Sequence, residues 1–322
     1  MLRVGGALLV AFALGAGLGK VLLPVLHKLK FGQNIYELAP ESHQKKQGTP
    51  TMGGFVVAGA AVISALVFAR YADADMPLLA AMLLMALGNL AIGMADDLTK
   101  IRRGKNGGLS PKQKLVAQTA LAAAFSVWCA LNPQIGTSII IPFLRCELNL
   151  GLLYVPIMTF VVVGTTNSAN LLDGLDGLLS SVSMVDFITL AVLACSAACW
   201  NLGIACAAVC GGCMAFLLYN AYPAKVFLGD TGSMFLGGAV SAAAVMLRQP
   251  LLLILIAFWM MMSSVSDLIQ FAYFRKTHGK RFFKMAPIHH HFELSGMHEA
   301  KIVMMYLVTT AALCVIALMG AL

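Results

Sequence analysis

Charged residues are scarce in this chain of 322 residues: only 11% are Asp, Glu, Lys or Arg, whereas 60% are hydrophobic. A soluble protein with this composition would have too little polar surface to present to water, so that class is excluded. Apolar stretches of about 18 residues or more recur along the whole chain, which is typical of an integral membrane protein. The first stretch, residues 4–26, lacks a small-residue cleavage site before the basic residues that follow, so we interpret it as a permanent helix rather than a signal peptide.

Other familiar signals are missing as well. The chain has no G-x-x-x-x-G-K-[ST] segment, which excludes a Walker P-loop. Cys210-Gly-Gly-Cys213 matches C-x-x-C formally, but it lies inside an apolar stretch without His or acidic neighbours. Close packing of small residues explains it better than metal or redox chemistry. No internal repeat of the kind common in transporters is visible.

Ten candidate membrane-spanning segments can be assigned, and the segments that connect them alternate between two sides. One side carries 17 of the 22 Lys and Arg residues. The positive-inside rule makes that side cytoplasmic and leaves both termini outside. We therefore predict one polytopic all-α membrane domain over residues 1–322, with a short hairpin within the outer loop 132–151. The predicted spans are residues 4–26, 52–69, 77–95, 115–131, 152–170, 178–198, 202–219, 234–247, 251–273 and 302–318.

Five short polar segments interrupt the apolar sequence, and all five fall on the predicted cytoplasmic side. Topology and attraction to anionic lipid explain an excess of Lys and Arg there. Carboxylates and histidines that converge on the same face need another reason, because they are costly near a bilayer. The segments therefore indicate a functional site, and they comprise residues 46–54, 96–97, 167–177, 227–233 and 286–293.

Two of these segments carry acids suited to phosphate chemistry. Asp96 and Asp97 follow each other at the end of a predicted span, where adjacent side chains point about 100° apart. One can face a cavity, where it suits a divalent cation or a base linked to a phosphate, while the other binds a neighbouring loop. Asp230 precedes a span whose start can bind phosphate, with Thr231 and Ser233 as candidate caps. A hard carboxylate at this position suits magnesium.

A third segment alternates amides and acids. Asn167, Asn170, Asp173 and Asp176 recur every three residues, with glycines that permit a break in the helix. Hydrogen-bonding groups of this kind suit a polar ligand such as a nucleobase or a ribose. Phe227, in the segment before Asp230, can stack on a base.

Cationic groups complete the set. Ser110 is a candidate N-cap followed by proline, and Lys114 and Gln118 then share one face of the helix. Lys46 lies in a separate glycine-containing segment.

Three consecutive histidines, 289–291, form the last polar segment. Their side chains diverge on any regular backbone, and no ligand lies at zinc spacing. We therefore expect contacts from them to phosphate and hydroxyl groups rather than a structural metal.

Together these segments resemble the phospho-N-acetylmuramoyl-pentapeptide transferases, within the polyprenyl-phosphate N-acetylhexosamine-1-phosphate transferase superfamily. The motifs match in order and spacing from residue 46 to residue 293, and the histidine segment favours the muramoyl-pentapeptide branch. The resemblance implies ten spans in a bacterial inner membrane, a homodimer, and a cytoplasmic Mg²⁺-dependent site. The implied reaction moves phospho-N-acetylmuramoyl-pentapeptide from UDP to undecaprenyl phosphate, giving lipid I and UMP. No nucleic-acid partner is expected.

The resemblance also assigns roles to residues of this chain. It implies catalytic roles for Asp96, Asp97, Lys114, Asp230, His290 and His291, with Asp230 as the magnesium ligand. It implies substrate contacts for Lys46, Asn170, Asp173, Asp176, Phe227 and His289. The sequence departs from the family pattern at Leu98, Leu172, Ser263 and Asp267.

Two alternative functions stay open at this point. One is a relative that uses UDP-N-acetylglucosamine, and the other is a transporter or flippase of an anionic lipid-linked substrate. A transporter would need charges at mid-span, where this sequence has mainly Lys20 and Asp186. The sequence also leaves open whether transfer is direct or proceeds through a covalent intermediate.

Overall fold

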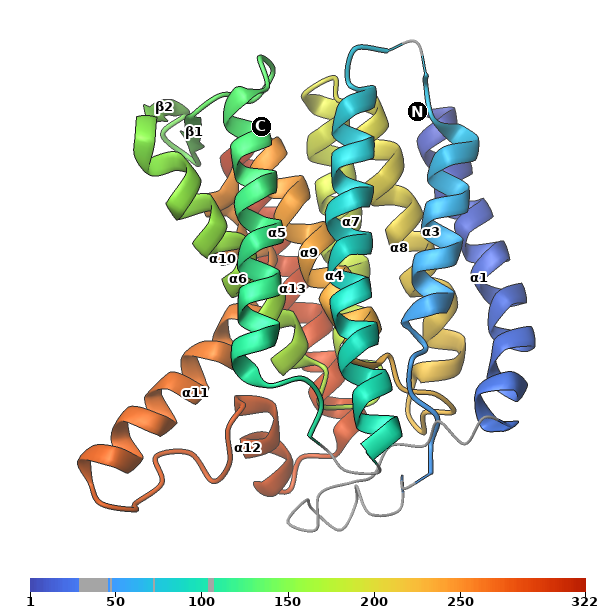
Figure 1. Ribbon diagram of the computed structural model, residues 1–322, viewed down its shortest axis with the longest axis vertical. Coiled ribbons are helices and arrows are strands. Elements are labelled where there is room, and N and C mark those ends of the chain that lie inside the picture. Colours follow the sequence, from blue (N-terminus) through green and yellow to red (C-terminus); the bar gives the residue numbers. More distant parts are fainter. Residues whose placement is uncertain (29–45, 47, 72, 104–106) are drawn as a thin grey trace.

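A computed structural model describes residues 1–28, 46, 48–71, 73–103 and 107–322, and these residues form a bundle of long helices with one small hairpin (Figure 1). The loop predicted for residues 27–51 lies mostly outside the described residues. The longer helices are α1 (Leu2–Lys28), α3 (Gly54–Phe68), α4 (Met76–Arg103), α5 (Pro111–Leu131), α6 (Tyr154–Leu172), α7 (Leu178–Ser196), α8 (Trp200–Asn220), α9 (Gly229–Met246), α11 (Phe258–Lys276) and α13 (Glu299–Ala321). The shorter elements are β1 (Ser138–Ile141), β2 (Cys146–Asn149), 3₁₀ turns at Gly151–Leu153 and Pro250–Leu252, α10 (Leu253–Ile256) and α12 (Ile288–Leu294).

Every predicted span coincides with a helix or a helix pair, so the class of all-α membrane protein is confirmed. Within the described residues, seven helices are long and apolar enough to cross a membrane, or eight if one bent pair counts as a single span. The helix α3 has only 15 residues. At 1.5 Å per residue it falls short of a hydrocarbon layer about 30 Å thick. The total of ten spans stays a prediction.

The helix α9 forms the centre of the bundle. All its residues from Thr231 to Met246 are buried, and it packs mainly against α4 and α6. Small residues permit this close packing: a side chain at Gly237 would collide with Thr166, and one at Gly238 would collide with Asn89. Association through small residues is the usual way in which helices pack inside membranes. The buried position of α9 fixes its first turn, which carries Asp230, among the ends of the surrounding helices.

The ninth predicted span, residues 251–273, is wrong as a straight helix. The helix is broken after Ile256, and α11 makes an angle of 84° with the short helical segment Pro250–Ile256. The stacking of Trp259 on Tyr306, with ring centroids 3.9 Å apart, holds the bend against α13. The second half carries polar residues, including Asp267 and Gln270, that a straight span would place in lipid. The bend instead turns this part of α11 toward α12 and the segment that joins them (Figure 1).

The hairpin predicted within residues 132–151 is confirmed. Strands β1 and β2 pair antiparallel, with Ser138 opposite Asn149. Arg248, at the end of α9, fastens the hairpin to the bundle through its carbonyl, which accepts from the Ile140 N–H at 2.7 Å, and through an ion pair with Glu147 at 2.6 Å. Both chain termini lie at this end of the bundle in Figure 1. We call it the hairpin end, and we call the opposite end, with α12 and the start of α5, the polar end.

Candidate active site

Asp97 is bound to the start of α9. Its Oδ1 accepts the Asp230 N–H at 3.2 Å, and its Oδ2 accepts both the N–H and the hydroxyl of Thr231, at 2.9 and 2.7 Å. A carboxylate at this place accepts hydrogen bonds from the free N–H groups of the helix start. It is also stabilised by the positive end of the helix dipole. The expectation that Thr231 and Ser233 cap this helix is therefore wrong, because α9 begins earlier, at Gly229, and a carboxylate of α4 caps it from outside.

Close contact between α4 and α9 depends on two glycines. A side chain at Gly93 would collide with the carbonyl group of Asp230. Gly229 has a φ of +75°, a conformation that side chains rarely adopt, and lies against Asp97 and Thr51. These positions let the ends of the two helices meet, so that Asp96, Asp97 and Asp230 converge.

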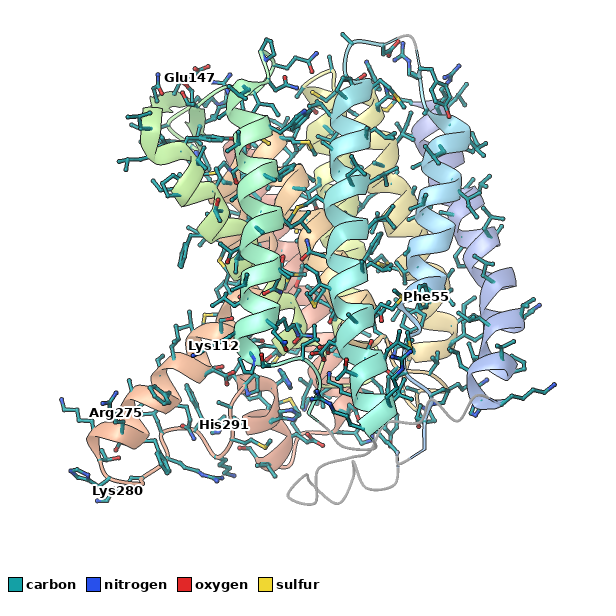
Figure 2. The ribbon with its side chains drawn as sticks, viewed as in Figure 1. Phe55, Lys112, Glu147, Arg275, Lys280 and His291 are labelled. Carbon is teal, nitrogen blue, oxygen red and sulfur yellow. The ribbon has the colours of Figure 1, made fainter. Side chains whose placement is uncertain are left out.

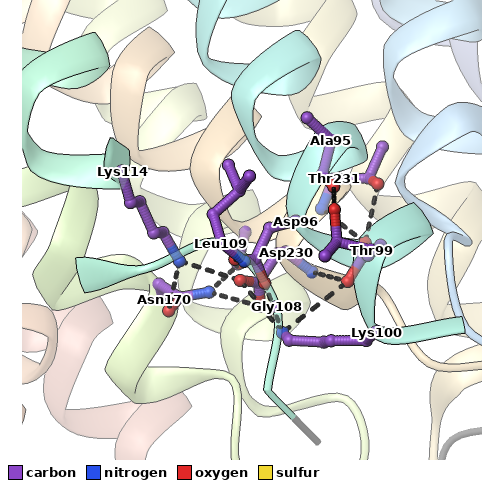
Figure 3. Close-up of polar contacts among 12 residues, drawn as sticks. Ala95, Asp96, Thr99, Lys100, Gly108, Leu109, Lys114, Asn170, Asp230 and Thr231 are labelled. Carbon is purple, nitrogen blue, oxygen red and sulfur yellow. Dashed lines mark hydrogen bonds and ion pairs between the residues drawn. The ribbon is translucent and has the colours of Figure 1, made fainter. Parts of the chain in front are cut away.

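The side chain of Asp230 points toward α5 and α6, where it meets Lys114 and Asn170 (Figure 3). Its Oδ1 accepts from the amide of Asn170 at 3.0 Å, and its Oδ2 lies 2.8 Å from the Lys114 ammonium and 3.2 Å from that of Lys100. Burial opposes ionisation, but Lys100 and Lys114 outweigh it and hold the pKa of Asp230 below its ordinary value. Asp230 is therefore ionised throughout the physiological range and available to a cation.

Asp96 completes the acidic cluster. It is 3% exposed, its Oδ1 accepts the Leu109 N–H at 2.9 Å, and its Oδ2 lies 2.7 Å from Lys100 (Figure 3). The sequence predicts that one acid of the pair faces a cavity while the other binds a neighbouring loop. The loop contact belongs to Asp96, which also meets Lys100, whereas Asp97 holds the start of α9.

Lys100 was missed in the sequence. Its ammonium lies within 3.9 Å of all three carboxylates, those of Asp96, Asp97 and Asp230. The signal was present, because Lys100 follows Asp97 by three residues and Asp96 by four, which places all three on one side of a helix end.

The acidic cluster fits a divalent cation. Among the residues that the structure describes, Asp96, Asp97 and Asp230 are the one group of three or more potential ligands whose oxygens lie within 4.8 Å of one another. Three carboxylates against two ammonium groups leave an excess of negative charge, and hard oxygen donors are what Mg²⁺ prefers. Asp96 and Asp230 are the better candidates, because each shares an oxygen with a lysine that a cation can displace, whereas both oxygens of Asp97 accept hydrogen bonds from the N–H and hydroxyl groups at the start of α9.

A second ionic cluster lies at the turn between α6 and α7. The Lys46 ammonium is 2.8 Å from Asp176 and 2.8 Å from Glu299, and all three side chains are largely buried. Glu299 also accepts the Asp176 N–H at 2.5 Å, and Asp176 accepts the Ala224 N–H at 2.9 Å. Burial lowers the pKa of Lys46, but its two carboxylate partners outweigh this and raise it overall. Glu299 was missed because nothing near it in the sequence marks it.

Asp173 directly follows α6, at the turn that also carries Asp176. Burial raises its pKa, and the negative charges of Asp230, Asp97 and Asp176 raise it further.

The backbone of Phe227 is held just before the start of α9. Its N–H donates to the Pro50 carbonyl at 2.8 Å, and its carbonyl accepts from the Gly53 N–H at 2.9 Å. Its ring is half-buried.

The start of α5 agrees with its sequence signals. Ser110 caps the helix and forms a reciprocal capping box with Gln113. Lys114 and Gln118 lie on the face that meets α6, where Lys114 also approaches Asn170 at 3.4 Å and Gln118 accepts from Asn167 at 2.9 Å. The cap therefore aims a lysine at the acidic cluster.

The prediction that the three histidine side chains diverge is wrong for the first two: the rings of His289 and His290 lie against each other, with centroids 4.3 Å apart, and only His291 points elsewhere. His289 is fully buried against Gly174, next to Asp173. His290 lies 3.2 Å from Glu293, and the ring of His291 accepts from the Lys284 N–H at 3.2 Å. The role of the histidines in substrate contacts stays a prediction.

The buried helices and the convergent acids and lysines define a multi-pass membrane protein with a site for phosphoryl chemistry. Residues 79–248 match glycosyl transferase family 4. The chain is 43% identical over 310 residues to a phospho-N-acetylmuramoyl-pentapeptide-transferase of Clostridium novyi, covering 96% of this chain and 94% of the relative. A relative of the same name from Clostridium perfringens is 44% identical over 311 residues, covering 97% and 94%. The chain therefore belongs to the phospho-N-acetylmuramoyl-pentapeptide-transferase family of peptidoglycan synthesis.

Proposed function

We propose that this protein transfers phospho-N-acetylmuramoyl-pentapeptide from UDP to undecaprenyl phosphate at the acidic cluster, in a magnesium-dependent reaction that releases UMP. The observation that carries this proposal is the convergence of Asp96, Asp97 and Asp230 within 4.8 Å, with Lys100 and Lys114 beside them. Two anionic substrates must approach each other here, and the site supplies groups for both a cation and phosphate oxygens.

Each residue has a distinct task in this proposal. Asp230 and Asp96 would hold Mg²⁺, which neutralises phosphoryl charge when bound. Lys114, near Asn170 on a capped helix, would bind a phosphate oxygen of the nucleotide substrate. Lys100 can exchange its carboxylate contacts for a phosphate as the substrate binds. Catalysis of this kind rests on positioning and charge neutralisation rather than on covalent chemistry by the protein.

Asp97 is poorly suited to be a nucleophile. Both its oxygens accept hydrogen bonds from the start of α9, so attack on phosphorus would release that helix end. Asp96 is the carboxylate that a covalent route would then use. We propose that Asp96 instead orients the lipid phosphate, whose oxygen attacks the phosphorus directly and displaces UMP from the pyrophosphate. A covalent route would give exchange of labelled UMP into the UDP-substrate without any lipid phosphate. Such exchange would contradict direct transfer.

The function is tested by following UMP release from purified protein with Mg²⁺, undecaprenyl phosphate and either UDP-N-acetylmuramoyl-pentapeptide or UDP-N-acetylglucosamine. We expect turnover with the first nucleotide and its loss with EDTA. Turnover with only the second would assign the chain to the alternative branch. Movement of substrate across a vesicle membrane without UMP release would favour a transporter instead.

The side of the membrane and the oligomeric state belong to the same proposal. The polar end is expected to face the cytoplasm, because the UDP-substrate is made there and the basic residues gather there. Cysteine probes within residues 96–114 should be labelled only from the cytoplasm, and a probe near Arg145 only from outside. A homodimer is expected from the family and is tested by mass measurement in detergent. Labelling of residues 96–114 from outside would contradict this topology.

A further inference from the structure

The segment from α11 to α12 has an unusual charge distribution. Residues 268–292 contain no Asp or Glu, yet they carry five exposed basic side chains. Figure 2 shows Arg275 and Lys280 at the outer limit of this segment, well away from the helical bundle. The basic residues are Arg275, Lys276, Lys280, Arg281 and Lys284. None of them belongs to the acidic cluster, so the proposed reaction does not account for them.

Large apolar side chains are exposed on the same segment. Leu268 is 67% exposed, Phe271 66%, Phe274 46% and Phe282 58%. Several large exposed apolar side chains on one short segment indicate a site of interaction with a membrane or a partner. Residues 268–292 therefore expose apolar and basic side chains together.

The segment is an ordered structure. The side-chain oxygen of Gln270 accepts the N–H groups of Phe282 and Phe283 at 3.1 and 2.9 Å, and its amide donates to the Phe283 carbonyl at 3.2 Å. The ring of Phe282 meets Tyr273 edge-on, with centroids 5.4 Å apart. The chain after α11 is thus folded back onto it, and the apolar and basic side chains are presented together on a built surface. We call residues 268–287 the lateral arm, which begins directly after Asp267.

We propose that the lateral arm docks on anionic phospholipid headgroups of the membrane leaflet at the polar end. The bend of 84° between residues 250–256 and α11 directs α11 away from the side of the bundle (Figure 1). Aromatic rings suit the boundary between headgroups and hydrocarbon, and Lys and Arg extend from it to lipid phosphates. A soluble phosphate would satisfy the basic groups but not the exposed Leu268 and Phe271, so the membrane surface fits better.

Docking would also reach the histidine segment. The Lys284 N–H donates to His291 at 3.2 Å, and the ring of Phe283 lies 5.6 Å from that of His291. A lipid surface that steadies the arm would therefore steady α12. This consequence rests on the proposed function, since it predicts a transferase whose turnover depends on anionic lipid.

The experiment compares the wild type with Lys280→Glu/Arg281→Glu, and with a control, Lys28→Glu/Lys112→Glu, that makes the same charge change on exposed residues of the polar end outside the lateral arm. Each protein is purified in detergent, and its retained phosphatidylglycerol is counted by mass spectrometry. Each is also assayed in nanodiscs of phosphatidylcholine with and without phosphatidylglycerol. We expect roughly five-fold higher turnover of the wild type with the anionic lipid, declining as salt is raised, and the control should match it. The arm variant should lose both the gain and most of the retained lipid.

Equal lipid retention and equal turnover in the arm variant and the control would overturn the proposal. Displacement of the lipid by millimolar inorganic phosphate would also overturn it and assign the basic groups to a phosphate site. If the charge reversals impair folding, Lys280→Gln/Arg281→Gln removes the charges without introducing acids. A wild type that retains lipid but never releases UMP would refute the proposed function and leave the docking proposal intact.

Discussion

The two ends of the bundle use buried polar groups in opposite ways. At the hairpin end, Asp75 has a purely structural set of partners: it accepts the backbone N–H of Asn201 at 2.6 Å and its amide at 2.9 Å. At the polar end, three carboxylates converge within 4.8 Å. Like charges that share a site raise the free energy of the folded protein. The acidic cluster therefore does not stabilise the fold as Asp75 does. This difference identifies the polar end as the functional one.

The largest effect is expected at Asp230. Asp230→Asn keeps the size of the side chain but removes the negative charge that would attract Mg²⁺, so turnover should fall by roughly a thousand-fold or more. UMP release measured over a magnesium titration checks this. Thermal stability without substrate should change little. Near-normal activity at low magnesium would show that Asp230 is not a metal ligand.

A comparison of the two neighbouring acids separates a structural from a reactive carboxylate. Asp97→Asn should destabilise the protein by about 1.5–3 kcal/mol, because Asp97 accepts from Asp230 and Thr231 at the start of α9. Asp96→Asn should abolish turnover and affect the melting temperature less. Thermal unfolding in one detergent, with UMP release alongside, checks both. Equal melting temperatures for the two variants would refute the capping role of Asp97.

The second ionic cluster predicts a smaller and more specific change. Glu299→Gln keeps an acceptor for the Asp176 N–H but removes one of the two charges that hold Lys46. The KM for the UDP-substrate should rise on the order of ten-fold, since a hydrogen bond to a charged group contributes about 1.5 kcal/mol. Turnover at saturation should be nearly normal, and Glu299→Asp should restore part of the affinity. A fall in kcat with unchanged KM would show that Glu299 acts elsewhere.

The smallest effect is expected at the hairpin end, where a matched substitution serves as the control. Glu147→Gln breaks the ion pair with Arg248, but the Glu147 side chain is 60% exposed. Exposed pairs contribute about 0–1 kcal/mol, so stability should change within that range and the KM not at all. Thermal unfolding and steady-state kinetics test this. A change in KM as large as that of Glu299→Gln would erase the contrast between the two ends.

Much of the site was predictable because its motifs are local. The acid pair, the capped helix with Lys114, and Asp230 at a helix start each occupy a few consecutive residues, and the structure brings all of them together. Lys100 was overlooked although its spacing from the acid pair is visible. Glu299 could not have been found, because its partner Lys46 lies 253 residues away and only packing brings them to 2.8 Å.

The sequence by itself determined that this is a multi-pass helical membrane protein with its chemistry at one end. So many long apolar stretches are stable as helices only within a lipid bilayer. Short polar motifs keep their sequence spacing in any fold. Only the tertiary structure decided that Asp97 caps α9, that α11 bends away from the bundle, and that Glu299 holds Lys46. These features arise from contacts between distant segments, whose free energies depend on burial and geometry that no local pattern records.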